Sequence, residues 1–395
     1  MFPTDVVIVA GARTPMARYT GAFSDTSAID LAAHASKEAI KRSGANPEEF
    51  DHAIFGNVMQ TSADALYGAR HVALKAGLKT ETPAVTVNRL CGSGIEAVAQ
   101  AAQRLLLGES QLVLAGGMEN MTQAPFVIRG LRSGLKLGGG QLEDSLMVGL
   151  TDTYCGLPMA MTAEKLAEQF GITRRDADAY ALRSQQAADA AYKACRIREE
   201  LVPVEVKQGK KTMVVSEDDH RRPETTMETL EKLPPSFKKD GMVTAGNASG
   251  IVDGAAAVVV TREKIAKERG LKALGRIVSW ATVGVDPSIM GIGPVPSSQK
   301  ALQLAGLTVA QLDRVEVNEA FAAQYLAVEK ALGLNRDKTN VNGGAIALGH
   351  PLGASGTRLL ITLLNELRRH GLRYGLATAC IGGGQGIAMI VESVQ

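Results

Sequence analysis

The chain lacks three features that would define its class at once: a long apolar run, a strong charge of one sign and a spaced set of metal ligands. No apolar run reaches the length of about 18 residues that a membrane-spanning helix requires, so we expect no membrane span. Because 43 basic and 41 acidic side chains leave a net charge of +2, we expect no nucleic-acid partner. The cysteines lack metal-ligand spacing and are expected to be free thiols: Cys91, Cys155, Cys195 and Cys380.

The start of the sequence also lacks a targeting segment. Residues 6–10 are apolar and predict a buried strand close to the first residue, which leaves no room for a signal or transit peptide. We therefore expect a location in a bacterial cytoplasm, with the mitochondrial matrix as the alternative.

The length of 395 residues suggests about two or three domains. Strands and helices alternate along residues 1–120 and again along residues 272–395, which predicts parallel-rich sheets covered by helices. Residues 121–271 have a different texture, and we interpret them as an insertion that forms a substrate-binding cap and returns at its end to the N-terminal half. The insertion contains a glycine-rich run at 130–140, predicted helices over 163–170 and 174–194, and a polar stretch over 207–235.

The two alternating segments repeat one another with a shift of 262 residues. Ser93-Gly94 and Ser355-Gly356 are one such pair, and each opens a long predicted helix. A constant shift favours an internal duplication over the chance recurrence of strand–turn–helix units. Further pairs at this shift are Gly44 with Gly306, Phe50 with Leu312, and Asp51 with Asp313.

Cys91 lies in a tight turn, residues 88–94, between a predicted strand over 83–87 and a predicted helix over 95–107. Backbone N–H groups at a helix start favour negative charge, so the turn is expected to lower the thiol pKa below its ordinary value of about 8.5. Cys91 is then a candidate nucleophile. A small buried cysteine that only packs in a turn explains these residues equally well.

The second half carries polar residues at corresponding places. His350 lies before the predicted helix at 355, so a pseudo-twofold arrangement of the halves would bring it to Cys91 as a base; alone, it would be an ordinary loop histidine. Cys380 begins the run 380–386, whose glycines expose N–H groups that could bind an oxyanion, although a small core cysteine is the alternative. Asn318 follows a predicted strand and could hold a water or a carbonyl, or simply cap a helix.

Five motifs in this order resemble the thiolase family nearly from end to end: NRLCGSG, GGMENMTQAP, NEAFA, NVNGGAIALGHPLGASG and CIGGGQG. Within that family, LPMAMTAE, DPSIMGIGPVP and VTAGNASG are similar to the mitochondrial-type 3-ketoacyl-CoA thiolases. The resemblance implies an α/β thiolase fold, in which two duplicated βα halves form five layers (α-β-α-β-α) with an inserted loop domain. That architecture agrees with the duplication and the insertion predicted above.

The resemblance also implies a role for each candidate residue. Cys91 corresponds to the cysteine that carries the acyl group, and His350 to the histidine that takes the thiol proton and later activates the thiol of CoA. Cys380 corresponds to the acid/base at the α-carbon of acetyl-CoA. Asn318 corresponds to the asparagine that positions a water beside His350 in one oxyanion hole, and the N–H groups of Cys91 and Gly382 to the other.

Further residues are implied to contact the substrate. Coenzyme A thioesters are the implied substrates, and no metal or permanently bound cofactor is implied. The family forms homodimers or homotetramers, and residues 130–140 would be a tetramer-forming loop. Three residues of the implied CoA site contact CoA and three line the pantetheine channel: Arg222, Thr225 and Ser249, and Phe237, Ala245 and Phe321. Pro158 and Met159 would line the acyl pocket, and Lys238 and Lys239 would add positive charge.

The function implied is thiolytic cleavage of a 3-ketoacyl-CoA, together with the reverse Claisen condensation. A biosynthetic acetoacetyl-CoA thiolase is an alternative with the same residues. A ketoacyl-carrier-protein synthase would use one cysteine with histidine partners, so Cys380 and the NEAFA motif favour a thiolase. A non-catalytic CoA-binding scaffold would have no need of the catalytic set.

Overall fold

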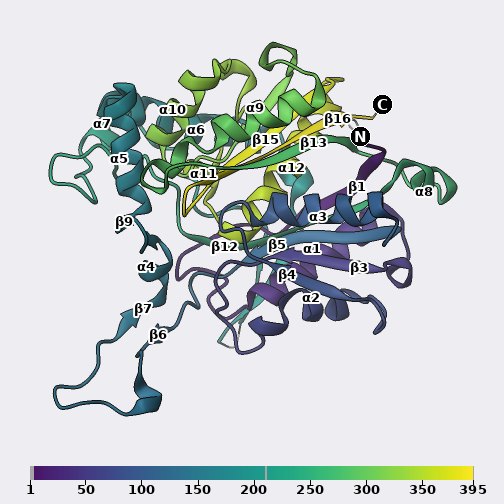
Figure 1. Ribbon diagram of the computed structural model, residues 1–395, viewed down its shortest axis with the longest axis horizontal. Coiled ribbons are helices and arrows are strands. Elements are labelled where there is room, and N and C mark those ends of the chain that lie inside the picture. The colour runs from purple at the N-terminus through teal and green to yellow at the C-terminus, as the bar shows by residue number, and fades with distance from the viewer. Residues whose placement is uncertain (1–3, 210, 395) are drawn as a thin grey trace.

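The computed structural model describes residues 4–209 and 211–394, and its centre is one large mixed sheet (Figure 1). The strands hydrogen-bond in the order β14-β15-β16-β13-β1-β12-β5-β3-β4. Their bounds are β1 (Val6–Arg13), β3 (His52–Gly56), β4 (Ala84–Val87), β5 (Leu112–Glu119), β12 (Val252–Arg262), β13 (Gly275–Gly284), β14 (Arg314–Val317), β15 (Tyr374–Ile381) and β16 (Gln385–Ser393), with β2 (Ala17–Arg18) beside β12.

The two halves of the sheet have the same strand order, which confirms the internal duplication. The first half runs β1-β12-β5-β3-β4, and the second runs β13-β16-β15-β14. A bridge from Val315 of β14 to Thr339 stands where β4 pairs with β3. β15 follows β5 at a shift of 262 residues along its whole length. The duplicated frame therefore extends to the strands that end at the candidate site.

The prediction of parallel-rich sheets is wrong for the centre of this sheet. Among the described strands, parallel pairs occur only toward the outer edges, where β3 pairs with β4 and β5 and where β14 pairs with β15. The other pairs are antiparallel. β16 follows β15 through the short turn 382–384, and such a turn can join neighbouring strands only in antiparallel order. β12 returns from the insertion at the end of the sheet where β5 leaves it.

Helices cover both faces of the sheet and fill the space between its halves, which confirms the five layers. α1 (Ala28–Ser43) and α2 (Gly68–Ala76) pack on the outer face of the first half, and α9 (Pro294–Ala305) and α10 (Ala322–Leu332) on that of the second. α3 (Ser93–Leu107) and α12 (Leu352–Arg369) lie together in the middle layer.

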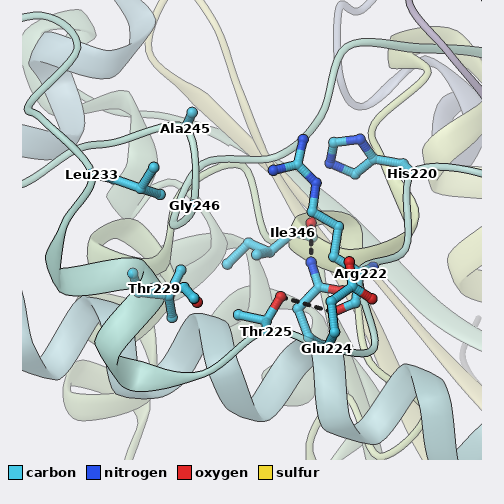
Figure 2. A pocket seen from close by; sticks show the side chains of 11 residues that line it. His220, Arg222, Glu224, Thr225, Thr229, Leu233, Ala245, Gly246 and Ile346 are labelled. Atoms are coloured by element: carbon cyan, nitrogen blue, oxygen red, sulfur yellow. Dashed lines mark hydrogen bonds between the residues drawn. The ribbon is translucent and has the colours of Figure 1, made fainter.

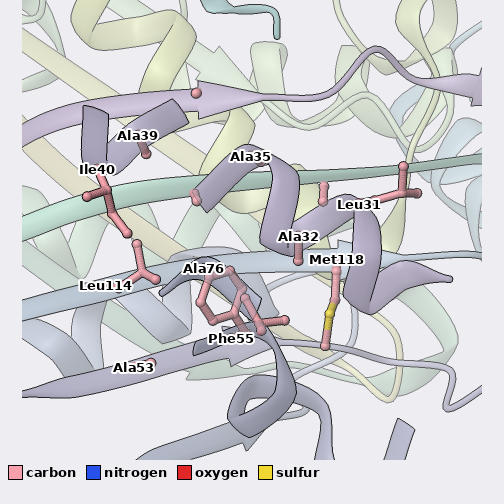
Figure 3. Close-up of a cluster of buried hydrophobic side chains, with 14 of the residues drawn as sticks. Leu31, Ala32, Ala35, Ala39, Ile40, Ala53, Phe55, Ala76, Leu114 and Met118 are labelled. Atoms are coloured by element: carbon pink, nitrogen blue, oxygen red, sulfur yellow. The ribbon is translucent and has the colours of Figure 1, made fainter. Parts of the chain in front are cut away.

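The packing of α1 shows how its sequence forms an outer layer. Ser27 caps the helix by accepting a hydrogen bond from the Asp30 N–H, and Gly44 ends it in the left-handed region. The apolar face of the helix lies on the sheet (Figure 3), and a buried leucine or isoleucine there contributes about 1.5–3 kcal/mol. Labelled side chains of this cluster are Leu31, Ala32, Ala35, Ala39 and Ile40 of the helix and Phe55, Leu114 and Met118 of the strands.

Glycines allow the starts of α3 and α12 to meet. A Cβ atom at Gly94 would lie 2.5 Å from the backbone nitrogen of Thr357, and one at Gly117 would lie 1.8 Å from the carbonyl oxygen of Gly353. Real Cβ atoms do not approach other atoms so closely, so larger residues would push the two halves apart. The close approach brings the turns before these two helices to one place.

Helices of the insertion pack against the second half, where Tyr180 and Leu230 join the buried cluster of α10, and the β6–β7 hairpin extends away from the body (Figure 1). Helix α5 begins four residues before the predicted start at 163. The remaining elements are β6 (Phe126–Val127), β7 (Glu143–Asp144), α4 (Ser145–Gly149), β8 (Thr151–Asp152), β9 (Leu157–Pro158), α5 (Met159–Phe170), α6 (Arg174–Lys193), β10 (Val204–Gln208), β11 (Lys211–Val215), α7 (Met227–Glu231), α8 (Glu263–Glu268) and α11 (Ala345–Leu348). In the described parts of the chain, no helix combines the length and the apolar character that crossing a membrane requires.

Candidate active site

Cys91 lies in a constrained turn between β4 and α3. The residue before it, Leu90, has a φ of 46°, which is unusual for a residue other than glycine. The Ser93 hydroxyl holds the turn by donating to the Leu90 carbonyl at 2.7 Å and accepting from the Arg89 N–H at 2.8 Å. Gly92 is required because a Cβ there would lie 2.6 Å from the Ile381 side chain. The turn therefore holds the thiol against the end of β15.

The expected lowering of the Cys91 pKa is wrong. Burial raises the pKa of this thiol to about 11, and the nearby Glu119 carboxylate raises it further. The N–H groups of Gly382 and of Cys91 itself face the sulfur and act in the opposite direction, but burial outweighs them. Cys91 is therefore a protonated thiol at rest and requires a base before it can attack a carbonyl.

His350 is such a base, and its hydrogen bonds define which ring nitrogen is free. Its Nδ1 lies 2.6 Å from the Ser355 hydroxyl, which itself donates to the Pro351 carbonyl. Its Nε2 lies 3.3 Å from the side-chain nitrogen of Asn318. These partners assign the ring proton to Nδ1 and leave Nε2 as the acceptor. The sequence pattern identified Ser355 only as the start of a helix and did not predict its hydrogen bond with His350.

Burial lowers the pKa of His350 to about 3, and the Arg358 guanidinium acts in the same direction. The imidazole is therefore neutral at neutral pH and free to accept a proton. Asn318 is fully buried, and α10 begins only at Ala322 after Phe321, so the interpretation of Asn318 as a helix cap is wrong.

The buried neutral His350 gives a first prediction, on stability against pH. Between pH 7 and pH 5 the unfolded chain binds a proton at this residue and the folded chain does not, so the free energy of unfolding falls by about 2 kcal/mol from this group alone. Denaturant titrations at pH 7 and pH 5 measure this change. The free energy of unfolding of His350→Asn is expected to fall by about 2 kcal/mol less than that of the wild type. The control is His34→Gln, a half-buried histidine whose Nε2 lies 2.7 Å from the Pro203 carbonyl oxygen. An equal fall in all three proteins would contradict the prediction.

Cys380 lies near Cys91 in the folded chain, although the two residues are far apart in the sequence. Its side chain is fully buried near the end of β15. Burial raises the pKa of the Cys380 thiol well above its ordinary value, and the proximity of Cys91 raises it further. The chain then reverses through Gly383 and Gly384, which have φ values of 79° and 83°, and this reversal presents the Gly382 N–H to Cys91.

An apolar cavity lined by His350 lies next to the packing around both cysteines. Its lining includes Leu352, a member of the buried cluster against which Cys91 packs, and Phe321, which packs against the buried cluster that contains Cys380. The imidazole therefore faces the cavity, and the two thiols belong to the side-chain clusters beside it.

The residues expected to bind CoA line two separate cavities. Arg222, Thr225 and Ala245 line one at the surface (Figure 2). Phe237, Ser249 and Phe321 line the one that contains His350, as do the residues expected at the acyl pocket, Pro158 and Met159. Lys238 is paired with Glu168 at 2.5 Å, so its charge is largely neutralised, whereas the Arg222 guanidinium extends into the surface cavity.

His220 is a residue of the surface cavity that the sequence did not identify. A Cβ atom added at Gly250 would lie 2.3 Å from the His220 ring. The Gly250 carbonyl accepts a hydrogen bond from the backbone N–H of His350 at 2.9 Å. Burial, with help from Arg222, lowers the pKa of His220 to about 4. This histidine therefore forms the wall between the two cavities. No local pattern could reveal it, because its packing partners lie elsewhere in the sequence.

Comparison with known proteins agrees with this fold. The thiolase N-terminal domain matches residues 6–264 and the thiolase C-terminal domain matches residues 271–393. The chain therefore belongs to the thiolase family. It is 54% identical to the human mitochondrial 3-ketoacyl-CoA thiolase over 98% of both chains, and 50% identical to the acetyl-CoA acetyltransferase of Escherichia coli K12 over 98% of this chain and 99% of that protein.

Solved structures show the same relationship. The crystal structure of human mitochondrial 3-ketoacyl-CoA thiolase has a TM-score of 0.97 and 53% identity, covering 98% of this chain and 99% of that one. The structure of the same human enzyme in complex with CoA has a TM-score of 0.96 and 54% identity, covering 98% of each chain.

Proposed function

We propose that this thiolase cleaves a 3-ketoacyl-CoA into acetyl-CoA and a shortened acyl-CoA, and catalyses the reverse Claisen condensation. The observation that carries the proposal is that two protonated thiols, Cys91 and Cys380, lie near each other, and that the neutral His350 lines the apolar cavity beside the clusters in which these thiols pack. A nucleophile, a separate carbon acid and a base are the groups that the cleavage of a carbon–carbon bond beside a ketone requires.

In the first step His350 Nε2 takes the proton of the Cys91 thiol, and the thiolate attacks the 3-keto carbon. The oxygen of that ketone becomes an oxyanion, which the N–H groups of Cys91 and Gly382 would stabilise. Both groups already face the sulfur, so they are preorganised for the oxygen of the tetrahedral intermediate.

In the second step the bond between C2 and C3 breaks, and the enolate of acetyl-CoA leaves. The protonated His350 and a water positioned by Asn318 would stabilise the thioester oxygen of this enolate. The Asn318 Oδ1 is buried and has no hydrogen-bond partner among the described residues, so it is free to bind such a group. Cys380 donates its proton to C2 and releases acetyl-CoA.

Before the last step the proton held by His350 passes to the Cys380 thiolate, which restores both groups. His350 then takes the proton of a second CoA thiol, which attacks the acyl group on Cys91. When the shortened acyl-CoA leaves, His350 returns this proton to the Cys91 thiolate and the resting thiol is restored. The side chains around the acyl position are apolar, which supports an aliphatic acyl group as the substrate. They are Met121, Met147, Leu150, Pro158 and Met159.

The proposal is tested by the loss of acetoacetyl-CoA absorbance in the presence of CoA and by kcat/KM for thiolysis across 3-ketoacyl chain lengths. A preference for chains longer than four carbons supports the degradative enzyme. A preference for acetoacetyl-CoA supports the biosynthetic alternative, which the 50% identity to an acetyl-CoA acetyltransferase favours. If the absorbance of acetoacetyl-CoA does not fall although Cys91 is intact, the non-catalytic CoA-binding scaffold is supported instead.

A second prediction concerns the CoA site. Arg222→Ala is expected to raise KM for CoA by about 3- to 10-fold with kcat unchanged, because an exposed guanidinium contributes a uniform binding interaction with the anionic nucleotide. The effect should shrink as ionic strength increases. Lys232→Ala, which removes an exposed charge paired with Glu228, is the matched control. An equal rise in KM for both variants would show that only net charge matters.

We also propose that the chain divides into an N-terminal half (1–120), an inserted loop domain that binds CoA (121–271) and a C-terminal half (272–395).

The protein is proposed to act in a bacterial cytoplasm, or alternatively the mitochondrial matrix, as a homodimer or homotetramer. Exposed apolar side chains at Leu131, Leu135 and Leu137 support the loop 130–140 as a tetramer contact. Sedimentation equilibrium of the whole protein and of a variant with this loop shortened would distinguish a dimer from a tetramer.

A further inference from the structure

Glu119 is a buried carboxylate beside the candidate site that the proposed steps do not use. It is the last residue of β5, and its side chain is fully excluded from solvent. It belongs to the GGMENM segment, and its charge is near enough to Cys91 to raise the pKa of that thiol. A buried charge of this kind is costly unless hydrogen bonds compensate for it.

Four N–H groups from two parts of the chain donate to this carboxylate. Oε1 accepts from the Asn57 side chain at 3.0 Å and from the Met59 backbone at 2.9 Å. Oε2 accepts from the Val58 backbone at 3.2 Å and from the Gly353 backbone at 2.9 Å. The first three donors lie in the loop after β3, in the first half, whereas Gly353 lies in the first turn of α12, in the second half.

Hydrogen bonds continue from this loop to the nucleophile. The Val58 carbonyl accepts from the Asn88 side-chain nitrogen at 3.1 Å, and the Asn88 side-chain oxygen accepts from the Leu90 N–H at 3.0 Å. Leu90 directly precedes Cys91. On the other side, Gly353 follows His350 by three residues. A continuous chain of hydrogen bonds therefore runs from the Cys91 turn through Glu119 to the helix that begins after His350.

We propose that Glu119 is a positioning residue that holds the Cys91 turn and the His350 loop at their working separation. The inference rests on the proposed thiolase function and adds a residue to it. Only a carboxylate has acceptor sites for N–H donors on both oxygens, and its charge also suits the N-terminus of α12. An amide in its place would direct its own N–H groups at some of these donors.

The charge of Glu119 provides a readout besides rate. The titratable groups that face it are Cys91 from the turn after β4 and Asp253 from β12, and both are acidic. Burial raises the pKa of Glu119 to about 7, against the opposing effect of its N–H donors. The ionised, fully hydrogen-bonded form is therefore lost as pH falls through about 7, and the acidic limb of the kcat profile should report this titration.

The test compares acetoacetyl-CoA thiolysis by the whole protein with that of Glu119→Gln, Glu119→Asp, Asn88→Ala and the double variant Glu119→Gln/Asn88→Ala. Glu119→Gln is expected to lower kcat about 10- to 100-fold with little change in KM and to remove the acidic limb near pH 7. Glu119→Asp, which keeps the charge, should restore part of kcat. The double variant should be no slower than the slower single variant, because both changes break one network.

Glu366→Gln is the matched control, because Glu366 is an equally buried carboxylate at the opposite end of α12. It should lower Tm and leave kcat unchanged. The inference is overturned if Glu119→Gln keeps kcat and its acidic limb, or if the losses of the two single changes multiply. If Glu119→Gln does not fold, Glu119→Asp and Asn88→Ala still decide between these outcomes. An inactive wild-type protein would instead reject the proposed function itself.

Discussion

Replacing Cys91 by serine is expected to lower the rate of thiolysis by about 10⁴-fold or more and to abolish the acyl-enzyme adduct. The hydroxyl of serine is a far weaker acid than a thiol, so proton transfer to His350 is much less favourable from serine than from cysteine. The N–H groups of residues 91 and 382 would remain in place, so the variant should still bind substrate. Mass spectrometry of the protein after incubation with acetyl-CoA or acetoacetyl-CoA measures the adduct directly.

Cys155 and Cys195 provide matched controls, since both are free thiols with more exposure than Cys380. Cys155→Ser and Cys195→Ser are expected to keep the wild-type rate and the adduct on Cys91. An adduct found on Cys155 or Cys195 in the wild-type protein would contradict the assignment of the nucleophile.

Replacing Cys380 by alanine is expected to separate two reactions that share the acyl-enzyme. The rates of carbon–carbon cleavage and of condensation should fall by about 10²- to 10⁴-fold, because the group that gives a proton to C2 in cleavage and removes it in condensation is missing. Transfer of an acetyl group from acetyl-CoA to Cys91, and from there to a second CoA, moves no proton at carbon and should continue. Exchange of labelled CoA into acetyl-CoA measures the second reaction, and acetoacetyl-CoA thiolysis measures the first.

Cys380→Ser distinguishes chemistry from packing in this experiment. Serine nearly fills the volume of cysteine in this buried site, so a purely structural role predicts a rate close to that of the wild type. A role as the carbon acid predicts a loss similar to that of alanine. Equal losses of exchange and of thiolysis in both variants would reject the role of Cys380 as the carbon acid.

The raised pKa values of both thiols and the low pKa of His350 have one consequence for the mechanism. At rest the site holds no charged nucleophile or acid, because burial disfavours every ionised form. Charge would arise only when Cys91 transfers its proton to His350, and the oxyanion donors are then already in place. The apolar surroundings that raise the resting pKa values therefore also strengthen the electrostatic stabilisation of the intermediates.

The duplicated halves divide the chemistry unequally. At the shift of 262 residues, Gly353 corresponds to Cys91 and Met118 corresponds to Cys380. The first half thus supplies the nucleophile, and the second supplies the base and the proposed carbon acid. Both sets are located where strands end and where the middle helices begin, and that shared location explains how one frame could be specialised in two ways.

Much of the local structure followed from residues close together in the sequence. The turn at Cys91 depends on neighbouring residues and the match of the two halves depends on a repeat, and the structure confirms both. The candidate Cys91, His350 and Cys380 were accessible for the same reason, because each lies at a turn with its own pattern. Their meeting at one site required the duplication to be interpreted as a pseudo-twofold arrangement.

Contacts between distant residues could not be predicted in this way. In the first half of the sheet β12 is antiparallel to β5 because the insertion returns beside β5, a path that strand and helix propensity do not encode. His220 and Glu119 matter through partners in other segments, Gly250 for one and Val58 and Gly353 for the other. The sequence by itself determined the family of folds, the duplication and the candidate groups. Only the tertiary structure decided that the Cys91 pKa rises, because burial depends on what the whole chain packs around a thiol and outweighs the N–H groups of its own turn.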